Sequence, residues 1–179
     1  MANAFDFTNF DLGLSSGGGS YIRFLPSSNA WMLGKEEITL GDFTLLPETV
    51  KTGWGKMAEG QAPEWSWDDA PGKRGAQPSE DHKRGFAIKL IIDGNEVEWS
   101  STGTGPVMGF QTLFADVIAG MANNPGKVPV VKYTNSEAHK VGKGNTRKPL
   151  FKIEKWIDKP ATGAAAAFAN APALADEEF

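Results

Sequence analysis

The 179-residue chain contains no cysteine. It therefore offers no disulfide framework, no thiol nucleophile and no thiolate ligand for a metal ion. Histidine is scarce as well, since His82 and His139 stand alone without the paired spacing of a zinc site. We expect no catalytic residues, no metal and no cofactor, and hence a protein that is not an enzyme.

Long apolar runs are also missing. No stretch approaches about 18 consecutive apolar residues, so we expect no membrane-spanning segment. The first 14 residues lack a basic region followed by an apolar run, which argues against a secretory signal. With 40% apolar and 22% charged residues, the composition is that of a globular domain, for which the cytoplasm is the expected compartment.

The net charge of −4 is unevenly distributed. Residues 127–159 hold nine of the 18 Lys and Arg residues but only three acidic ones, whereas the last 20 residues carry acids alone. Such asymmetry favours a polyanionic partner. A solvated basic surface is the alternative.

Both ends of the chain are expected to be disordered extensions. Residues 1–20 form an N-terminal arm with a flexible Ser/Gly run, and residues 161–173 form an Ala-rich linker. The acidic tail that follows can occupy a basic groove on its own domain, where it competes with a bound polyanion, or it can bind a partner. The alternative is a disordered end that only increases solubility. The tail residues concerned are Asp176, Glu177, Glu178 and Phe179.

Residues 21–160 are expected to form one domain. Alternation and turn residues predict strands at 21–25, 30–33, 37–46 with a bend near 41, 86–92, 96–99, 127–134 and 150–157. Asp93-Gly94-Asn95 predicts a tight hairpin. Residues 47–85 are expected to be an irregular insertion, and 135–148 a polar, mobile loop.

One helix is expected between the fifth and sixth of these strands. Pro106 suits its first turn, and Asn123–Gly126 would end it. Its predicted apolar face consists of Val107, Phe110, Phe114, Val117, Ile118 and Met121.

This element order predicts a mainly β fold with one helix, arranged as an OB-like β-barrel with a long insertion. Such barrels bind oligonucleotides on one face and through two loops, and 135–148 would be one of these loops. A β-sandwich with an added helix is the competing architecture.

Aromatic residues interleaved with Lys and Arg suit the stacking of bases beside phosphate contacts. The alternative is that the tryptophans fasten the insertion to the barrel, and Trp156 equally suits a core position. The candidate DNA-binding residues are Lys51, Trp54, Lys56, Trp65, Trp67, Lys73, Arg74, Lys89, Trp99, Lys132, Tyr133, Lys140, Lys143, Arg147, Lys148, Lys152 and Trp156.

The barrel, the basic loop, the Ala-rich linker and the terminal Asp176-Glu177-Glu178-Phe179 together resemble the single-stranded DNA-binding proteins of bacteriophages, and more distantly bacterial SSB. The Pro that precedes the final Phe in bacterial SSB tails is absent, which favours the phage type. The resemblance implies a role in phage DNA replication or recombination in a bacterial host cell. It also implies a tail that recruits replication or recombination proteins, and it is compatible with a homo-oligomer. A carbohydrate-binding β-module and a phage assembly protein are the alternatives.

Overall fold

The computed structural model describes residues 20–57 and 63–160. The expected N-terminal arm, the Ala-rich linker and the acidic tail lie outside these residues, apart from Ser20. The described chain forms nine strands and one helix, which confirms the expectation of a mainly β fold. The elements are β1 (Ser20–Leu25), β2 (Ala30–Leu33), β3 (Glu36–Ile38), β4 (Asp42–Lys56), β5 (Glu64–Trp67), β6 (Lys83–Ile92), β7 (Asn95–Ser101), α1 (Thr104–Met121), β8 (Lys127–Val141) and β9 (Gly144–Asp158).

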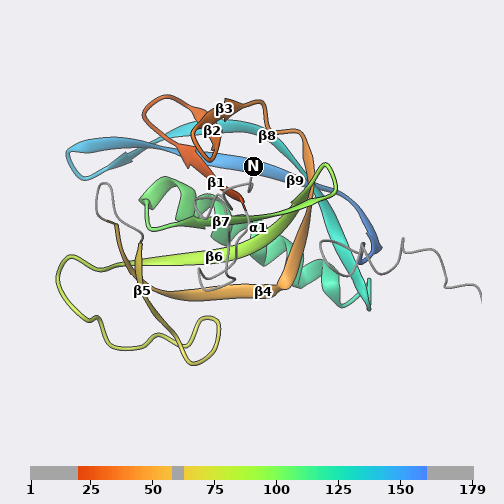
Figure 1. Ribbon diagram of the computed structural model, residues 1–179, viewed down its shortest axis with the longest axis horizontal. Coiled ribbons are helices and arrows are strands. Elements are labelled where there is room, and N and C mark those ends of the chain that lie inside the picture. The colour runs from red at the N-terminus through yellow and green to blue at the C-terminus, as the bar shows by residue number, and fades with distance from the viewer. Residues whose placement is uncertain (1–19, 58–62, 161–179) are drawn as a thin grey trace, which may run out of the picture.

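All nine strands belong to one sheet. Their order is β3-β2-β1-β7-β6-β4-β8-β9, and β5 pairs with the outer part of β4. The β1–β7 pair is parallel and the other pairs are antiparallel. The sheet curls into a half-barrel, and α1 runs across its middle in the view of Figure 1. The helix packs mainly against β9.

The β6–β7 hairpin forms as its local sequence predicts. Asp93 and Gly94 both have positive φ, at 50° and 80°, as a two-residue hairpin turn with the favoured twist requires. Strand β6 then alternates, with Phe86, Ile88 and Leu90 buried on the inner face of the sheet.

Aromatic side chains fill the inside of the half-barrel. The Phe86 and Phe110 rings stack with centroids 3.9 Å apart, and Trp99 meets Phe86 edge-on at 4.9 Å. Trp31 in turn lies 5.5 Å from Trp99. Because Trp99 is fully buried, these rings join the sheet and the helix in one apolar core.

The expectation of an irregular insertion at 47–85 is wrong for much of its length. Strand β4 continues to Lys56, β5 pairs with it, and β6 begins at Lys83. A register shift between Leu46 and Lys51 accommodates Pro47 without ending the strand. The Thr49 hydroxyl bridges this bulge, donating to Leu46 O (2.7 Å) and accepting from Lys89 N (2.9 Å).

The expected loop at 135–148 is also an extended structure. Strands β8 and β9 continue as a long hairpin whose turn lies at Val141–Gly144. Most residues at this end are exposed or half-buried, so no apolar alternation marks them as strands. The stretch at 37–46, by contrast, is divided between β3 and β4.

The helix occupies the expected residues, but its buried face differs. Leu113 is buried, whereas Ile118 and Met121 are 57% and 42% exposed. Trp156 packs under the helix, where a Cβ on Gly120 would overlap its indole ring. No helix in residues 20–57 and 63–160 is long and apolar enough to cross a membrane.

Candidate nucleic-acid interface

Two tryptophans of β5 form a stacked pair. The rings of Trp65 and Trp67 are 4.3 Å apart and nearly parallel, at 8°. They share one face of the strand because they are two residues apart. Trp67 is 37% exposed and Trp65 is half-buried, so the pair presents aromatic surface to solvent.

Glycines form the floor beneath this pair. Gly53 and Gly55 of β4 are paired with Trp67 and Trp65, and Gly85 of β6 lies beside them. A Cβ on Gly55 would lie 2.8 Å from the Trp65 ring, and one on Gly85 would lie 2.9 Å from it. The indole of Trp65 therefore lies directly on the backbone, a close approach that a larger residue would prevent.

Positive charge lies beside the pair, although part of it is neutralised. The Lys51 ammonium is 5.6 Å from the centroid of the Trp67 ring, a cation–π distance. Lys89 is bound to Glu96 at 2.9 Å. Burial raises the pKa of Glu98, although the charges of Lys51 and Lys89 oppose this rise. Lys51 is therefore the exposed cation best placed to meet a phosphate next to a stacked base.

A buried carboxylate anchors the end of β5. Asp68 accepts two hydrogen bonds from Arg84, at 2.8 and 2.6 Å, and one from the Thr52 hydroxyl at 2.6 Å. Gly75 N donates a fourth at 3.1 Å. The Asp68 side chain is only 1% exposed. Its pKa is held well below the usual range, chiefly by the hydrogen bonds from Arg84.

Trp54 faces away from the stacked pair and has a structural role. It is buried, and its indole nitrogen donates to Gly75 O at 2.9 Å. Arg74 and Arg84 lie over its ring, at 4.9 and 5.3 Å from the centroid. Trp54 therefore fastens the 68–82 segment to β4, as the alternative interpretation of the tryptophans holds.

The remaining cations of the former insertion are peripheral. Lys56 lies 3.8 Å from Asp81, and Lys73 is exposed within 68–82. Among the described residues, neither ammonium group forms a cation–π contact with Trp65 or Trp67.

The β8–β9 hairpin carries the second group of candidates. Lys140 and Lys143 are exposed near its turn, and Lys148 is half-buried opposite Glu137. Lys132 and Lys152 are directly opposite each other and both are exposed. Opposed like charges destabilise a sheet, but Lys132 also lies directly opposite Asp42 of β4, whose negative charge offsets this effect. Within residues 20–57 and 63–160, none of these lysines forms a salt bridge.

Arg147 is committed to an internal contact. Its Nε donates to the Ser136 hydroxyl at 2.8 Å and its Nη2 to Ser136 O at 3.1 Å. The backbone of Arg147 also lies so close to Gly105, near the start of α1, that a Cβ there would overlap it. Arg147 therefore positions the hairpin against the helix.

The two candidate groups lie at one end of the molecule. In Figure 1 the β8–β9 turn and the β5 region both extend toward the left-hand end. Residues 102–105 lie between the two groups. Thr102 lies where a Cβ on Gly55 or Gly85 would be, and Gly105 lies against the backbone of Arg147. The candidate interface thus combines the tryptophan pair, Lys51 and the hairpin lysines.

Several candidates lie elsewhere. Trp99 is fully buried and Tyr133 is half-buried in the aromatic core, so neither is available on the outer surface. Trp156 lies under α1 because a register shift places Glu154 in a bulge of β9, which moves Trp156 to the helix side.

Sequence reasoning missed Asp68 and Arg84, which hold β5 in place. One signal could have identified the tryptophan pair: Gly-x-Gly at 53–55 and Trp-x-Trp at 65–67 are complementary patterns for one face of paired strands. Among the described residues, no three His, Cys, Asp or Glu side chains are grouped as a metal site.

Comparison with protein-family models, with curated proteins and with solved structures finds no match.

Proposed function

We propose that this chain binds single-stranded DNA without reading its sequence, on an OB-like barrel. The observation that carries the proposal is the partly exposed Trp65–Trp67 stack with Lys51 beside it. Aromatic platforms next to cations bind successive bases and phosphates of a single strand whatever its sequence.

The connectivity supports an OB-like interpretation. Strands β4, β6 and β7 precede α1, and β8 and β9 follow it, as five barrel strands with a helix between the third and fourth. The pairs β4–β6, β6–β7, β4–β8 and β8–β9 are those of such a barrel. In place of a contact between β7 and β9, β7 pairs with β1. The 57–82 segment and the β8–β9 turn then correspond to the two loops through which OB barrels bind ligands.

Titration with single-stranded oligo(dT) tests the proposal, with intrinsic tryptophan fluorescence as the signal. One domain should cover ~4–16 nucleotides, and affinity should fall steeply as salt rises. Trp67→Ala should weaken binding by about 1–3 kcal/mol, the value of one stacked base. Trp67→Phe keeps an aromatic face and should retain part of that energy. Equal or tighter binding to a duplex of the same length would refute the proposal.

A carbohydrate-binding module is the second candidate, favoured by the same partly exposed tryptophan pair. OB-type barrels also bind oligosaccharides. Binding of a neutral oligosaccharide would be nearly independent of salt, whereas binding of DNA would not. The salt dependence therefore separates the two functions.

We further propose that the tail, Asp176 to Phe179, recruits replication or recombination proteins and competes with DNA for the basic surface. The support is the charge asymmetry of the chain and the terminal aromatic residue. A role in phage DNA replication would place the protein in the cytoplasm of a bacterial host.

A further inference from the structure

Tyr21 of β1 is an exposed aromatic residue on the outer face of the sheet. Within residues 20–57 and 63–160, the exposed Trp, Tyr and Phe side chains are those of Tyr21, at 46%, and Trp67, at 37%. The next residue of β1, Ile22, is buried in the core. Since successive side chains of a strand alternate between its two faces, the Tyr21 ring projects away from the core.

Strand pairing places Trp67 on this same outer face. Trp67 lies opposite Gly53 of β4, and Gly53 lies opposite Gly85 of β6. Directly opposed residues share a face of the sheet, and Gly85 precedes Phe86, which is buried in the core. The two exposed rings therefore project from one side of the half-barrel.

Neighbouring side chains connect the two rings across the sheet. The Lys51 ammonium lies 5.6 Å from the centroid of the Trp67 ring. Glu98 of β7 lies directly opposite both Lys89 of β6 and Tyr21. Burial raises the pKa of Glu98, and the charges of Lys51 and Lys89 oppose this rise, so both lysines lie near its carboxylate. The cation beside Trp67 and the Tyr21 ring thus both adjoin Glu98.

The middle of this face is low. Ala87 of β6 lies opposite Lys51 on one side and opposite Ser100 of β7 on the other. Small residues in a strand allow a ligand to approach the backbone closely. A bound chain can therefore lie near the sheet between the two rings.

Arg23 adds a cation to the Tyr21 end. It lies two residues after Tyr21 and hence on the same face, and it is exposed. Among the described residues, Arg23 takes part in no salt bridge. Strand β1 thus presents an aromatic ring and a cation together, as Trp67 and Lys51 do at the other end. This combination suits a base and its phosphate.

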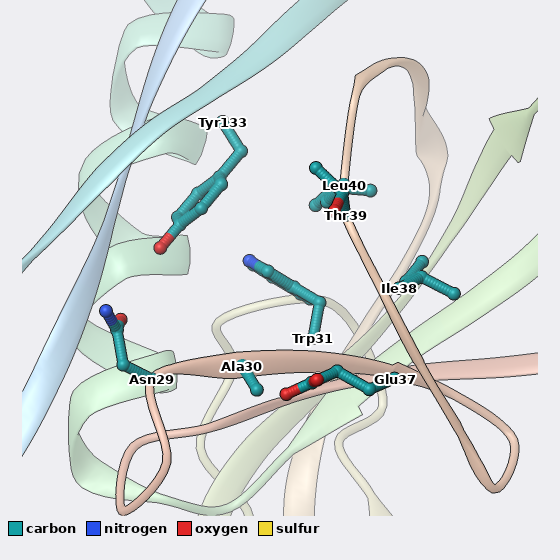
Figure 2. Close-up of a pocket in the computed structure, with 8 residues that line it drawn as sticks. All are labelled: Asn29, Ala30, Trp31, Glu37, Ile38, Thr39, Leu40 and Tyr133. Atoms are coloured by element: carbon teal, nitrogen blue, oxygen red, sulfur yellow. The ribbon is translucent and has the colours of Figure 1, made fainter.

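The aromatic residues of the adjoining strands point inward. Figure 2 shows Trp31 of β2 and Tyr133 of β8 beside a pocket of about 330 Å³. Their ring centroids are 5.5 Å apart, and both side chains pack in the aromatic core. At this end of the sheet, the ring available to a ligand on the outer face is that of Tyr21.

We propose that Tyr21 is a second stacking position for the same bound single strand, with Arg23 as its phosphate contact. The DNA then crosses the outer face from β5 to β1, which are four strand spacings apart. At ~4.8 Å each, these spacings give a span on the order of 20 Å. Roughly six stacked nucleotides cover that span at ~3.4 Å each, within the ~4–16 that one OB domain binds.

This path extends the candidate interface beyond the five barrel strands. Strand β1 is not one of them, and it continues the sheet by its parallel pairing with β7. The inference rests on the proposed function and adds a second end to the binding site.

Titration of ~16-nucleotide oligo(dT) tests the role of Tyr21. Tyr21→Ala should weaken binding roughly five- to 150-fold, the range for one stacked base, whereas Tyr21→Phe should retain most of the affinity. Ile118→Ala is the matched control, because it removes another exposed large side chain, on α1, and should leave the affinity unchanged. Arg23→Gln should lower the salt slope by roughly 0.7, the value of one phosphate contact on a single strand.

Glu98 provides a test that a folding defect cannot imitate. Because its carboxylate lies between the two rings, it repels a phosphate that crosses the sheet there. Glu98→Gln should therefore tighten binding roughly two- to fivefold at low salt, and the gain should fade as salt screens the charges. Asp116→Asn removes the same charge from the exposed side of α1 and should change the affinity little.

Photocrosslinking tests the path in the wild-type chain. A single strand that contains 5-iodouracil should, on irradiation of the complex, become attached to Tyr21 as well as to Trp67. Attachment at Trp67 without Tyr21, or an unchanged affinity of either Tyr21→Ala or Glu98→Gln, overturns the inference and leaves the proposed function intact. If no single strand binds, the proposed function fails and this inference fails with it.

Discussion

Replacing Asp68 with asparagine should release the strand that carries the tryptophan pair. Asp68 directly follows Trp67 and accepts hydrogen bonds from Arg84, Thr52 and Gly75. An asparagine has one acceptor oxygen, and its amide group would face donors. The substitution keeps the shape of the side chain, removes its charge and half of its accepting capacity, and sets an amide donor against the donors that remain.

The size of the expected stability loss follows from the burial of Asp68 and Arg84. Breaking a fully buried ion pair costs about 3–5 kcal/mol. The Asp68 side chain is 1% exposed but that of Arg84 is 27% exposed, so water recovers part of the arginine's solvation. We expect a loss of about 2–3 kcal/mol in the free energy of unfolding. Affinity for oligo(dT) should fall as well, because β5 would no longer hold the stacked rings in place.

Urea unfolding measures the first effect, and Asp69→Asn is the control because Asp69 is exposed and adjacent. The pH dependence of this stability loss tests whether the interaction between Asp68 and Arg84 causes it. Since Arg84 lowers the pKa of folded Asp68, the unfolded chain binds the proton first as the pH falls. The stability gap between wild type and Asp68→Asn should therefore be constant above about pH 5 and narrow below about pH 4. An unchanged urea midpoint, or a gap that widens in acid, would refute the reasoning.

Three further predictions concern other parts of the chain. Replacing Lys140 and Lys143 with alanine should reduce the salt slope of single-strand binding by roughly 0.7 per lost phosphate contact, whereas an unchanged slope would leave them as solvent surface. Gly120→Ala should lower stability by about 1–3 kcal/mol because its Cβ would overlap Trp156, which a lower midpoint in urea would show. Deleting residues 174–179 should tighten DNA binding at low salt and abolish partner capture, whereas Phe179→Ala should abolish only the capture. DNA affinity that is insensitive to the deletion would contradict the competition.

The sequence predicted those elements whose conformation depends on only a few neighbouring residues. The Asp93-Gly94 turn needs two positive φ angles, and the apolar residues of 86–92 mark a strand with buried side chains on both faces, so both follow from a few adjacent residues. The outer half of the β8–β9 hairpin has little apolar burial on either face. Its strand character comes from the register with the partner strand, which composition does not reveal.

The sequence predicted which residue types form the candidate site, but not which individual residues belong to it. Trp65 and Trp67 were grouped with the other tryptophans, although the match of their Trp-x-Trp to the Gly-x-Gly of β4, which the strand pairing realises, distinguishes them. Trp156 suited DNA binding and the core equally, and the bulge at Glu154, which turns it toward the helix, decides for the core. Arg147 was taken for a phosphate ligand, since its sequence neighbours give no sign of the bond to Ser136.

Lysines on the β8–β9 hairpin can also be explained without DNA, as charges that protect the edge of the sheet. Their positions distinguish the two explanations. Strand β9 is an edge of the sheet, and edge strands commonly use lysine and proline to prevent pairing with another chain. Pro149, Lys152 and Lys155 all satisfy that need. Lys132 does not, because β8 is paired on both sides. An exposed lysine there protects no edge, but it lies directly opposite Asp42 of β4 as well as Lys152 of β9, so a carboxylate of the same sheet is paired with its charge. The charge of Lys132 is therefore matched within the sheet, and the argument for a polyanion on this surface rests instead on the exposed Lys140 and Lys143 near the turn.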